Sequence, residues 1–197
     1  MDKKRLEKQL AFILEADKEK NILRQTHLCG YGRRENDAEH AWHITMMVFL
    51  LREYANESFD IAKAMMMALI HDIVEIDAGD TYAYDEEGLK TQKEREQRAA
   101  QRIFGLLPDD QRDEMRCLFQ EFEEGVTSEA RFVRAMDNFQ PLLLNHSNDG
   151  KDWREHGVVR SQVESRQHTS QYGSAAIWEY TEELIEKNVE RGNIKEG

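Results

Sequence analysis

The sequence predicts an all-α protein, on the evidence of its proline content, its few β-branched runs and its apolar spacing. The chain has 197 residues and only 2 prolines, and proline is the residue that interrupts helices most strongly. Runs of β-branched residues, which favour strands, are scarce. Apolar residues instead recur at intervals of three and four. We therefore expect a single-domain helical bundle over residues 1–197.

The first half of the chain contains three expected helices and one long loop. An apolar stripe at helical spacing runs through residues 6–14. The segment 21–35 is expected to be a loop, and no segment carries a strand signal strong enough to predict a sheet. Asn36 or Asp37 then caps a second helix. Asp60 caps a third helix, AKAMMMALIHD, whose apolar character is typical of the centre of a bundle.

The second half begins with an irregular, acidic and aromatic segment at 73–88. A charged amphipathic helix is expected over 91–107, and Pro108 suits the first turn of the helix after it. Thr127 or Ser128 caps a further helix, in which Pro141 predicts a kink.

The C-terminal part is expected to contain one loop and one long helix. The stretch 147–157 is polar and loop-like. The last helix is expected to include residues 175–191 and to stop at Gly192, a residue that commonly ends helices.

Charge and cysteine content restrict the classes of function. The 27 Lys and Arg against 39 Asp and Glu give a formal charge of -12, which disfavours binding to nucleic acid or to anionic membranes. A small phosphate ligand remains compatible, because a metal or a local cation can reverse the field inside a pocket. Neither a signal peptide nor a membrane span is evident, and the two cysteines form no CxxC pair. We expect a cytoplasmic protein.

The pair His71 and Asp72 is the most informative feature, because it ends the strongly apolar helix. A buried carboxylate is costly unless it is paired or binds a metal. The alternative is that the pair caps a helix at the surface, as most adjacent His-Asp pairs do. His40 lies early on the helix before the apolar one, and Asp137 lies on a mostly inward-facing helix. Together the four would form a mixed imidazole and carboxylate site. Such a set suits Mn²⁺, Fe²⁺, Co²⁺ or Zn²⁺ better than Mg²⁺.

The order of these residues resembles a known family. The segments EHAWH, LIHDIVEIDAGD and RAMDNF are similar to the H…HD…D pattern of the HD-domain metal-dependent phosphohydrolases, and most similar to their 5'-deoxynucleotidase branch. The resemblance implies a helical bundle of the HD-domain type that binds one divalent cation through His40, His71, Asp72 and Asp137. It covers a motif-bearing core at about 10–145, followed by a helical extension at about 158–192.

The same resemblance places Glu75 and Asp80 in the catalytic positions beside the metal. Glu75 is four residues after His71, so it lies on the same side if the helix continues for one turn. There it can hold or deprotonate a water whose pKa the cation lowers, and Asp80 can orient the water or protonate the leaving group. The alternative is that Asp80 belongs to a solvated acidic loop.

An arginine is expected to bind the phosphate, because its fork matches two phosphate oxygens. The family pattern has an arginine upstream of the first histidine, and Arg24 is the nearest match. Arg33 and Arg34 are alternatives. Where the bacterial form has an aromatic residue beside this arginine, the chain has Gln25, which leaves the preference for deoxyribose over ribose open.

These observations favour a metal-dependent phosphohydrolase that converts nucleoside 5'-monophosphates, with 2'-deoxy forms included as candidates, to nucleoside and phosphate. The expected partner is a small-molecule nucleotide. One alternative is a nucleoside triphosphate or alarmone phosphohydrolase, and another is a sensor that binds metal or nucleotide without catalysis. The Met-rich helices are also compatible with a homodimer.

Overall fold

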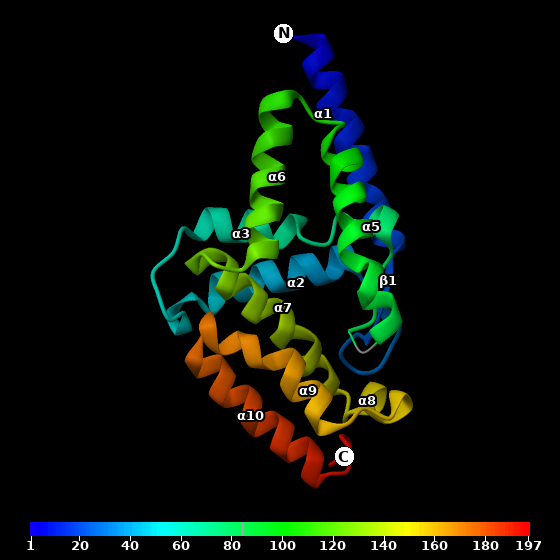
Figure 1. Cartoon of the computed structure of the whole chain (residues 1–197), viewed down its shortest axis with the longest axis vertical. Helices are drawn as coiled ribbons and strands as arrows, with labels where there is room; N and C mark the ends of the chain where they lie inside the picture. Colours follow the sequence, from blue (N-terminus) through cyan, green and yellow to red (C-terminus); the bar gives the residue numbers. More distant parts are fainter. Residues whose placement is uncertain (84) are drawn as a thin grey trace.

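The computed structural model describes residues 1–83 and 85–197, and helices make up most of them (Figure 1). In chain order the α-helices are α1 (Lys3–Ala16), α2 (Asp37–Leu50), α3 (Ile61–Ile70), α4 (Glu75–Ala78), α5 (Glu86–Phe104), α6 (Asp109–Glu124), α7 (Ser128–Ser147), α8 (Lys151–His156), α9 (Arg160–Gln167) and α10 (Ala175–Glu190). Short 3-10 helices cover η1 (Asp17–Asn21), η2 (Arg52–Tyr54) and η3 (His168–Tyr172). The all-α prediction is confirmed.

The main hydrophobic core lies where α2, α3 and α7 pack together in the middle of the molecule (Figure 1). Its fully buried side chains include Ile44 of α2, Met67 of α3 and Phe132 of α7. The C-terminal helices contribute to the same core through Val163 of α9 and Leu184 of α10. The central helix α3 is therefore held on several sides, as its apolar sequence indicates.

A second, smaller core joins α5 and α6 to the segment after α3. Ile103 and Phe104 of α5 are fully buried there against Phe119 of α6 and against Ile73 and Val74. Helix α1 packs beside α5 and projects with it toward the N-terminal end (Figure 1). This cluster fixes the backbone that follows His71.

The predicted helix starts at Asn36, Asp60 and Thr127 are confirmed by their hydrogen bonds. The Asn36 side chain accepts from the backbone N–H of Glu39, and the Glu39 side chain accepts from the backbone N–H of Asn36, which closes a capping box. Asp60 caps α3, and Thr127 caps α7. These caps satisfy backbone donors that would otherwise lack partners.

The loop expected at 21–35 is wrong, because this segment contains most of a small hairpin. Strands β1 (Leu23–His27) and β2 (Arg34–Asn36) pair antiparallel, with Leu23 opposite Asn36. Both strands are short and mostly polar, so they carry no alternation of apolar and polar residues. The hairpin determines where Arg24 lies.

Other expected boundaries also differ from the structure. The polar stretch 147–157 contains the short helix α8, which buries Trp153 in the core. Helix α5 starts at Glu86 instead of residue 91, after the N-cap Asp85, and Pro108 precedes the first turn of α6. Tyr84, within the segment expected to be irregular, lies outside the described residues.

Pro141 lies within α7, which continues to Ser147. Because proline has no N–H, the backbone carbonyl of Asp137 loses the donor that a helix normally provides. The predicted kink at this position stays a prediction.

Part of the apolar surface of α2 and α3 remains exposed, including Trp42, Met46 and Met66. The homodimer stays a prediction. Within residues 1–83 and 85–197, no helix has the length and apolarity needed to cross a membrane.

Candidate metal centre and its cavity

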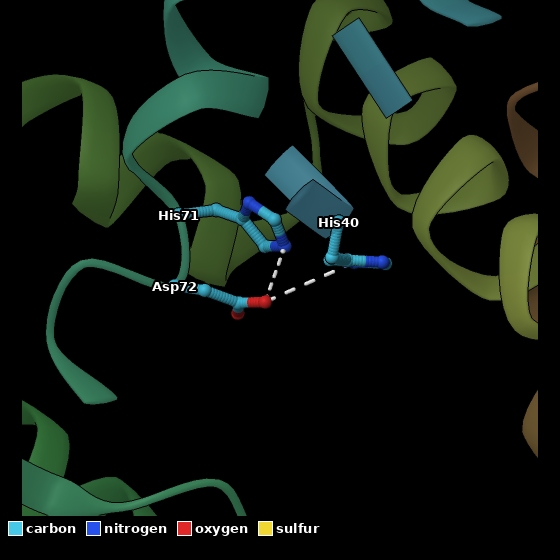
Figure 2. Close-up of side chains that lie close together, drawn as sticks. All are labelled: His40, His71 and Asp72. Carbon is cyan, nitrogen blue, oxygen red and sulfur yellow. Dashed lines mark ion pairs between the residues drawn. The ribbon is translucent and has the colours of Figure 1, made fainter. Parts of the chain in front are cut away.

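The four side chains expected to bind metal come together from three helices. His40 lies on α2, His71 and Asp72 follow the last residue of α3, and Asp137 lies on α7. Asp72 Oδ2 is 3.1 Å from His71 Nε2 and 3.8 Å from His40 Nε2 (Figure 2). Asp137 Oδ1 is 3.1 Å from His40 Nε2 and 3.7 Å from His71 Nε2. The two carboxylates thus face the same two imidazole nitrogens.

These distances match the spacing of ligand atoms around one cation. Two ligand atoms about 2.1 Å from a cation lie about 3.0 Å apart at a right angle and about 3.4 Å apart at a tetrahedral angle. The four imidazole-to-carboxylate distances, between 3.1 and 3.8 Å, lie within about 0.4 Å of the tetrahedral value. Both imidazoles are almost fully buried, at 0% exposure for His40 and 3% for His71.

The free nitrogen of His71 faces this cluster. Its Nδ1–H donates to the backbone carbonyl of Ala68 at 2.9 Å, and a carbonyl oxygen can only accept, so Nδ1 carries the proton. Nε2 is buried and has no hydrogen-bond partner among the described residues. In the neutral form of the imidazole, this buried nitrogen beside two carboxylates is a natural metal ligand.

A buried hydrogen-bond network places the proton of His40 on Nδ1, as in His71. Gln140 donates from Nε2 to the Glu35 carboxylate at 2.7 Å and to His43 Nδ1 at 3.0 Å. Its Oε1 therefore faces His40 and accepts from Nδ1–H at 3.0 Å, which leaves His40 Nε2 for a cation. Sequence reasoning missed Glu35 and Gln140. The position of Gln140 three residues after Asp137 on one helix was the available signal.

The electrostatics of the cluster also favour a cation. Burial lowers the pKa of His71, but the carboxylates of Asp72 and Asp137 raise it well above the ordinary histidine value. Burial raises the pKa of Asp72, whereas His71 and Arg24 hold it below the ordinary value. The cluster therefore stabilises positive charge between its side chains. Geometry, tautomers and charge all fit a divalent cation bound by His40, His71, Asp72 and Asp137.

A second group of carboxylates lies beside this cluster. Oxygen atoms of Asp37, Glu75 and Asp80 all lie within 4.8 Å of one another. The neighbouring acid Asp77 is instead exposed and bound by Arg102. The structure thus brings Glu75 and Asp80 to the site, and Asp80 does not belong to a solvated loop. Asp37 was expected only as a helix cap, and nothing in the residues around it indicates that it faces this group.

Crowding and burial make these carboxylates hard to ionise. Burial and the nearby charge of Asp72 raise the pKa of Asp37 to about 6, and the same two causes raise the pKa of Glu75 well above its ordinary value. Burial also raises the pKa of Asp80, although Arg24 opposes this shift. Glu75 is 6% exposed, and its Oε2 has no hydrogen-bond partner among the described residues. A carboxyl group of this kind is suited to exchange a proton near neutral pH.

Of the three candidate arginines, Arg24 lies at the site. Its Nη1 donates to Asp72 Oδ2 at 2.7 Å and to Asp37 Oδ1 at 3.2 Å. The exposed Arg33 is bound by the half-buried Glu39, and neither Arg33 nor Arg34 lines the cavity beside the cluster. Strand β1 places Arg24 there by running past the start of α2.

A cavity of about 370 Å³ opens beside these residues. Its wall includes His71, Asp72 and Asp137 of the candidate metal centre, together with Arg24, Glu75 and Asp80. Helices α5, α6, α7, α8 and α9, strand β1 and the segment 81–83 contribute the rest of the wall. This volume falls within the usual range of small-molecule sites, about 300–1,000 Å³.

Glu96 of α5, also in the cavity wall, makes stability depend on pH. Burial raises the pKa of Glu96 from 4.5 to about 7, so between these values the folded state binds more protons than the unfolded state. Stability therefore falls as the pH rises through this window.

We expect Glu96→Gln to raise the melting temperature at pH 8, where the Glu96 carboxyl group of the wild type is charged, and to change the melting temperature little at pH 5. The control is Glu94→Gln, which changes an exposed residue of the same helix. An equal effect of Glu96→Gln at both pH values would contradict this expectation.

Comparison with known proteins finds a matching family model and a similar solved structure. Residues 16–178 match the family model described as "HD domain". A solved structure from Magnetospirillum magnetotacticum MS-1, titled a predicted metal-dependent phosphohydrolase, has 49% identity and a TM-score of 0.92, and the match covers 96% of this chain and 95% of that chain.

Curated relatives named 5'-deoxynucleotidase HDDC2 are similar to part of the chain. The relative from Danio rerio is 30% identical over 112 residues, which are 57% of this chain and 54% of the relative. The relative from Homo sapiens is 28% identical over 111 residues, or 56% and 53% of the two chains. The chain thus spans about half the length of the curated relatives it matches. Because the family model covers most of the sequence, the chain belongs to the HD-domain family.

Proposed function

We propose that this protein is a metal-dependent phosphohydrolase that converts nucleoside 5'-monophosphates to nucleoside and phosphate. The observation that carries the proposal is the convergence of two imidazole nitrogens and two carboxylates at the wall of a 370 Å³ cavity. The names of the curated relatives, 5'-deoxynucleotidase, support a nucleotide substrate. The name of the Magnetospirillum structure supports metal-dependent phosphohydrolase chemistry.

The proposed metal ligands are His40, His71, Asp72 and Asp137. Two imidazoles with two carboxylates favour Mn²⁺, Fe²⁺, Co²⁺ or Zn²⁺ over Mg²⁺, which prefers oxygen ligands. When bound, the cation supplies Lewis-acid chemistry, because it lowers the pKa of water and offsets charge on the phosphate.

Glu75 and Asp80 are the proposed proton carriers. One carboxyl oxygen of Glu75 has no hydrogen-bond partner among the residues that the structure describes, so this atom is available to accept a proton from the attacking water. Asp80 lies within 4.8 Å of the same group and lines the cavity. We assign it to orienting the water or to protonating the leaving alkoxide.

Arg24 is proposed to bind the phosphate. Its Nη1 already holds Asp72 and Asp37, while its Nε and Nη2 groups make no hydrogen bond within residues 1–83 and 85–197. These remaining donors can bind phosphate oxygens in the fork geometry that arginine provides. Gln25, which also lines the cavity, stands where an aromatic residue is expected to contact the sugar.

The remaining features support a small substrate in a reducing compartment. Cys29 and Cys117 are both free, as suits the proposed cytoplasmic location. The formal charge of -12 opposes long-range attraction of a polynucleotide, whereas a mononucleotide carries little charge to repel.

A nucleotide panel tests the proposal. Metal-stripped protein reloaded with Mn²⁺, Co²⁺, Zn²⁺ or Mg²⁺ is mixed with matched ribo- and deoxyribonucleoside 5'-monophosphates and with the corresponding triphosphates. We expect the reloaded protein to release inorganic phosphate from the monophosphates, and the metal-stripped protein to release far less. Release of diphosphate or triphosphate from triphosphates alone would instead favour the triphosphatase alternative, and complete inactivity with every metal would favour a sensor.

A further inference from the structure

We propose that Arg166 of α9 is a second phosphate-binding residue of the site. This inference rests on the proposed function, because it assigns a further contact to the same phosphate group. Arg166 lies outside the segments that carry the family motif, and it lines the same cavity as Arg24, Asp72 and Asp137.

The position of Arg166 relative to Asp137 supports the proposal. Arg166 Nη2 is 3.5 Å from Asp137 Oδ2, whereas the other oxygen, Asp137 Oδ1, faces the imidazoles of His40 and His71. Arg166 therefore contacts the oxygen that points away from the candidate metal position. Its guanidinium is next to the metal ligands without competing for the ligand atom.

The guanidinium donors of Arg166 remain available to a ligand. Three arginines line the described cavity wall, and Arg134 donates from Nη1 to the carbonyls of Phe122 and Glu123, both at 3.1 Å. Arg24 donates to Asp72 and Asp37. Arg166, by contrast, makes no hydrogen bond within the described part of the chain, and its side chain is 43% exposed. It combines access to the cavity with unused donors.

The charge of the site indicates why a second arginine is useful. The carboxyl groups of Asp72 and Asp137 line the cavity, and in their charged form they repel a phosphate dianion. Arg24 contacts Asp72, and Arg166 contacts Asp137, so an arginine lies beside each carboxylate ligand. A phosphate bound next to the cation can therefore receive hydrogen bonds from both guanidinium groups.

Binding of inorganic phosphate tests this assignment without requiring turnover. The full-length protein is loaded with Mn²⁺, and phosphate affinity is measured by isothermal titration calorimetry for wild type, Arg166→Gln and Arg166→Lys. Loss of charge-assisted hydrogen bonds is expected to weaken phosphate binding about tenfold or more in Arg166→Gln. Arg166→Lys restores the charge but not the fork, and is expected to recover part of the affinity.

Lys93→Gln is the matched control, because it also removes one positive charge from the cavity wall. We expect it to change phosphate affinity less than about twofold, since an exposed charge without a direct contact is well screened. Equal losses in Lys93→Gln and Arg166→Gln would overturn the proposal in favour of a general field effect. Wild-type affinity in Arg166→Gln would overturn it as well.

Metal content separates binding from structural support. Arg166→Gln is expected to retain Mn²⁺ at the wild-type ratio, and loss of the metal would show that Arg166 only supports Asp137, which contradicts the proposal. The experiments also distinguish the phosphate-binding role of Arg166 from the proposed function. A wild-type protein that binds phosphate through Arg166 but hydrolyses no nucleotide would refute the proposed function alone.

Discussion

His71→Ala and Asp72→Ala are each expected to lower metal affinity and phosphate release by more than about 100-fold, the loss associated with disrupting even the supporting shell of a metal site. Each substitution removes one of four atoms that lie at ligand spacing. The remaining three ligands would have to hold the cation with a water in place of the missing side chain. Metal content after dialysis and release of inorganic phosphate measure the two losses.

Asp77→Ala is the control for these variants, because Asp77 lies in the same segment but is exposed and bound by Arg102. It is expected to retain both metal and activity. Far-UV circular dichroism checks that each variant remains helical. A folded Asp72→Ala protein with the metal content of wild type would contradict the proposed ligand set.

Glu75→Gln is expected to reduce turnover about 10²- to 10⁴-fold, the usual contribution of a general base, while metal content stays near that of wild type. Glutamine keeps the size of the side chain but cannot accept a proton at its amide nitrogen. Because Glu75 lies in the carboxylate group with Asp37 and Asp80, we expect it to act on the proton and not on the cation. Single-turnover phosphate release and metal analysis distinguish these roles.

Asp77→Asn serves as the matched control for Glu75→Gln, since it removes one nearby negative charge outside the site. If Glu75→Gln lost metal together with activity, Glu75 would have to be counted among the ligands. If turnover were unchanged, Glu75 would have no part in proton transfer. Loss of turnover with retained metal, in contrast, would exclude a sensor that binds metal without catalysis.

The sequence predicts the helices well where their signals are local. The apolar run of α3 and the caps at Asn36, Asp60 and Thr127 depend on neighbours a few residues away. The hairpin and α8 escaped prediction because their strands and turns are short and polar, and Trp153 becomes buried only through tertiary packing.

Some residues of the candidate site could likewise be predicted from local motifs, whereas others could not. The ordered motif identified His40 and His71, which the structure brings together. Gln140 can be identified only once the inward face of the helix that carries Asp137 is known. Its partner Glu35 lies 105 residues away in the sequence. Arg166 contacts Asp137 through the packing of α9 against α7. Pairings between distant segments depend on how the helices pack, and spacing along one chain does not encode them.

The position of the bound metal tests the central claim most directly. Crystals of the full chain soaked in Mn²⁺ are measured at a wavelength where manganese scatters anomalously. We predict an anomalous peak about 2.0–2.3 Å from His40 Nε2, His71 Nε2, Asp72 Oδ2 and Asp137 Oδ1. The absence of a peak between these four atoms in manganese-loaded crystals would contradict the account.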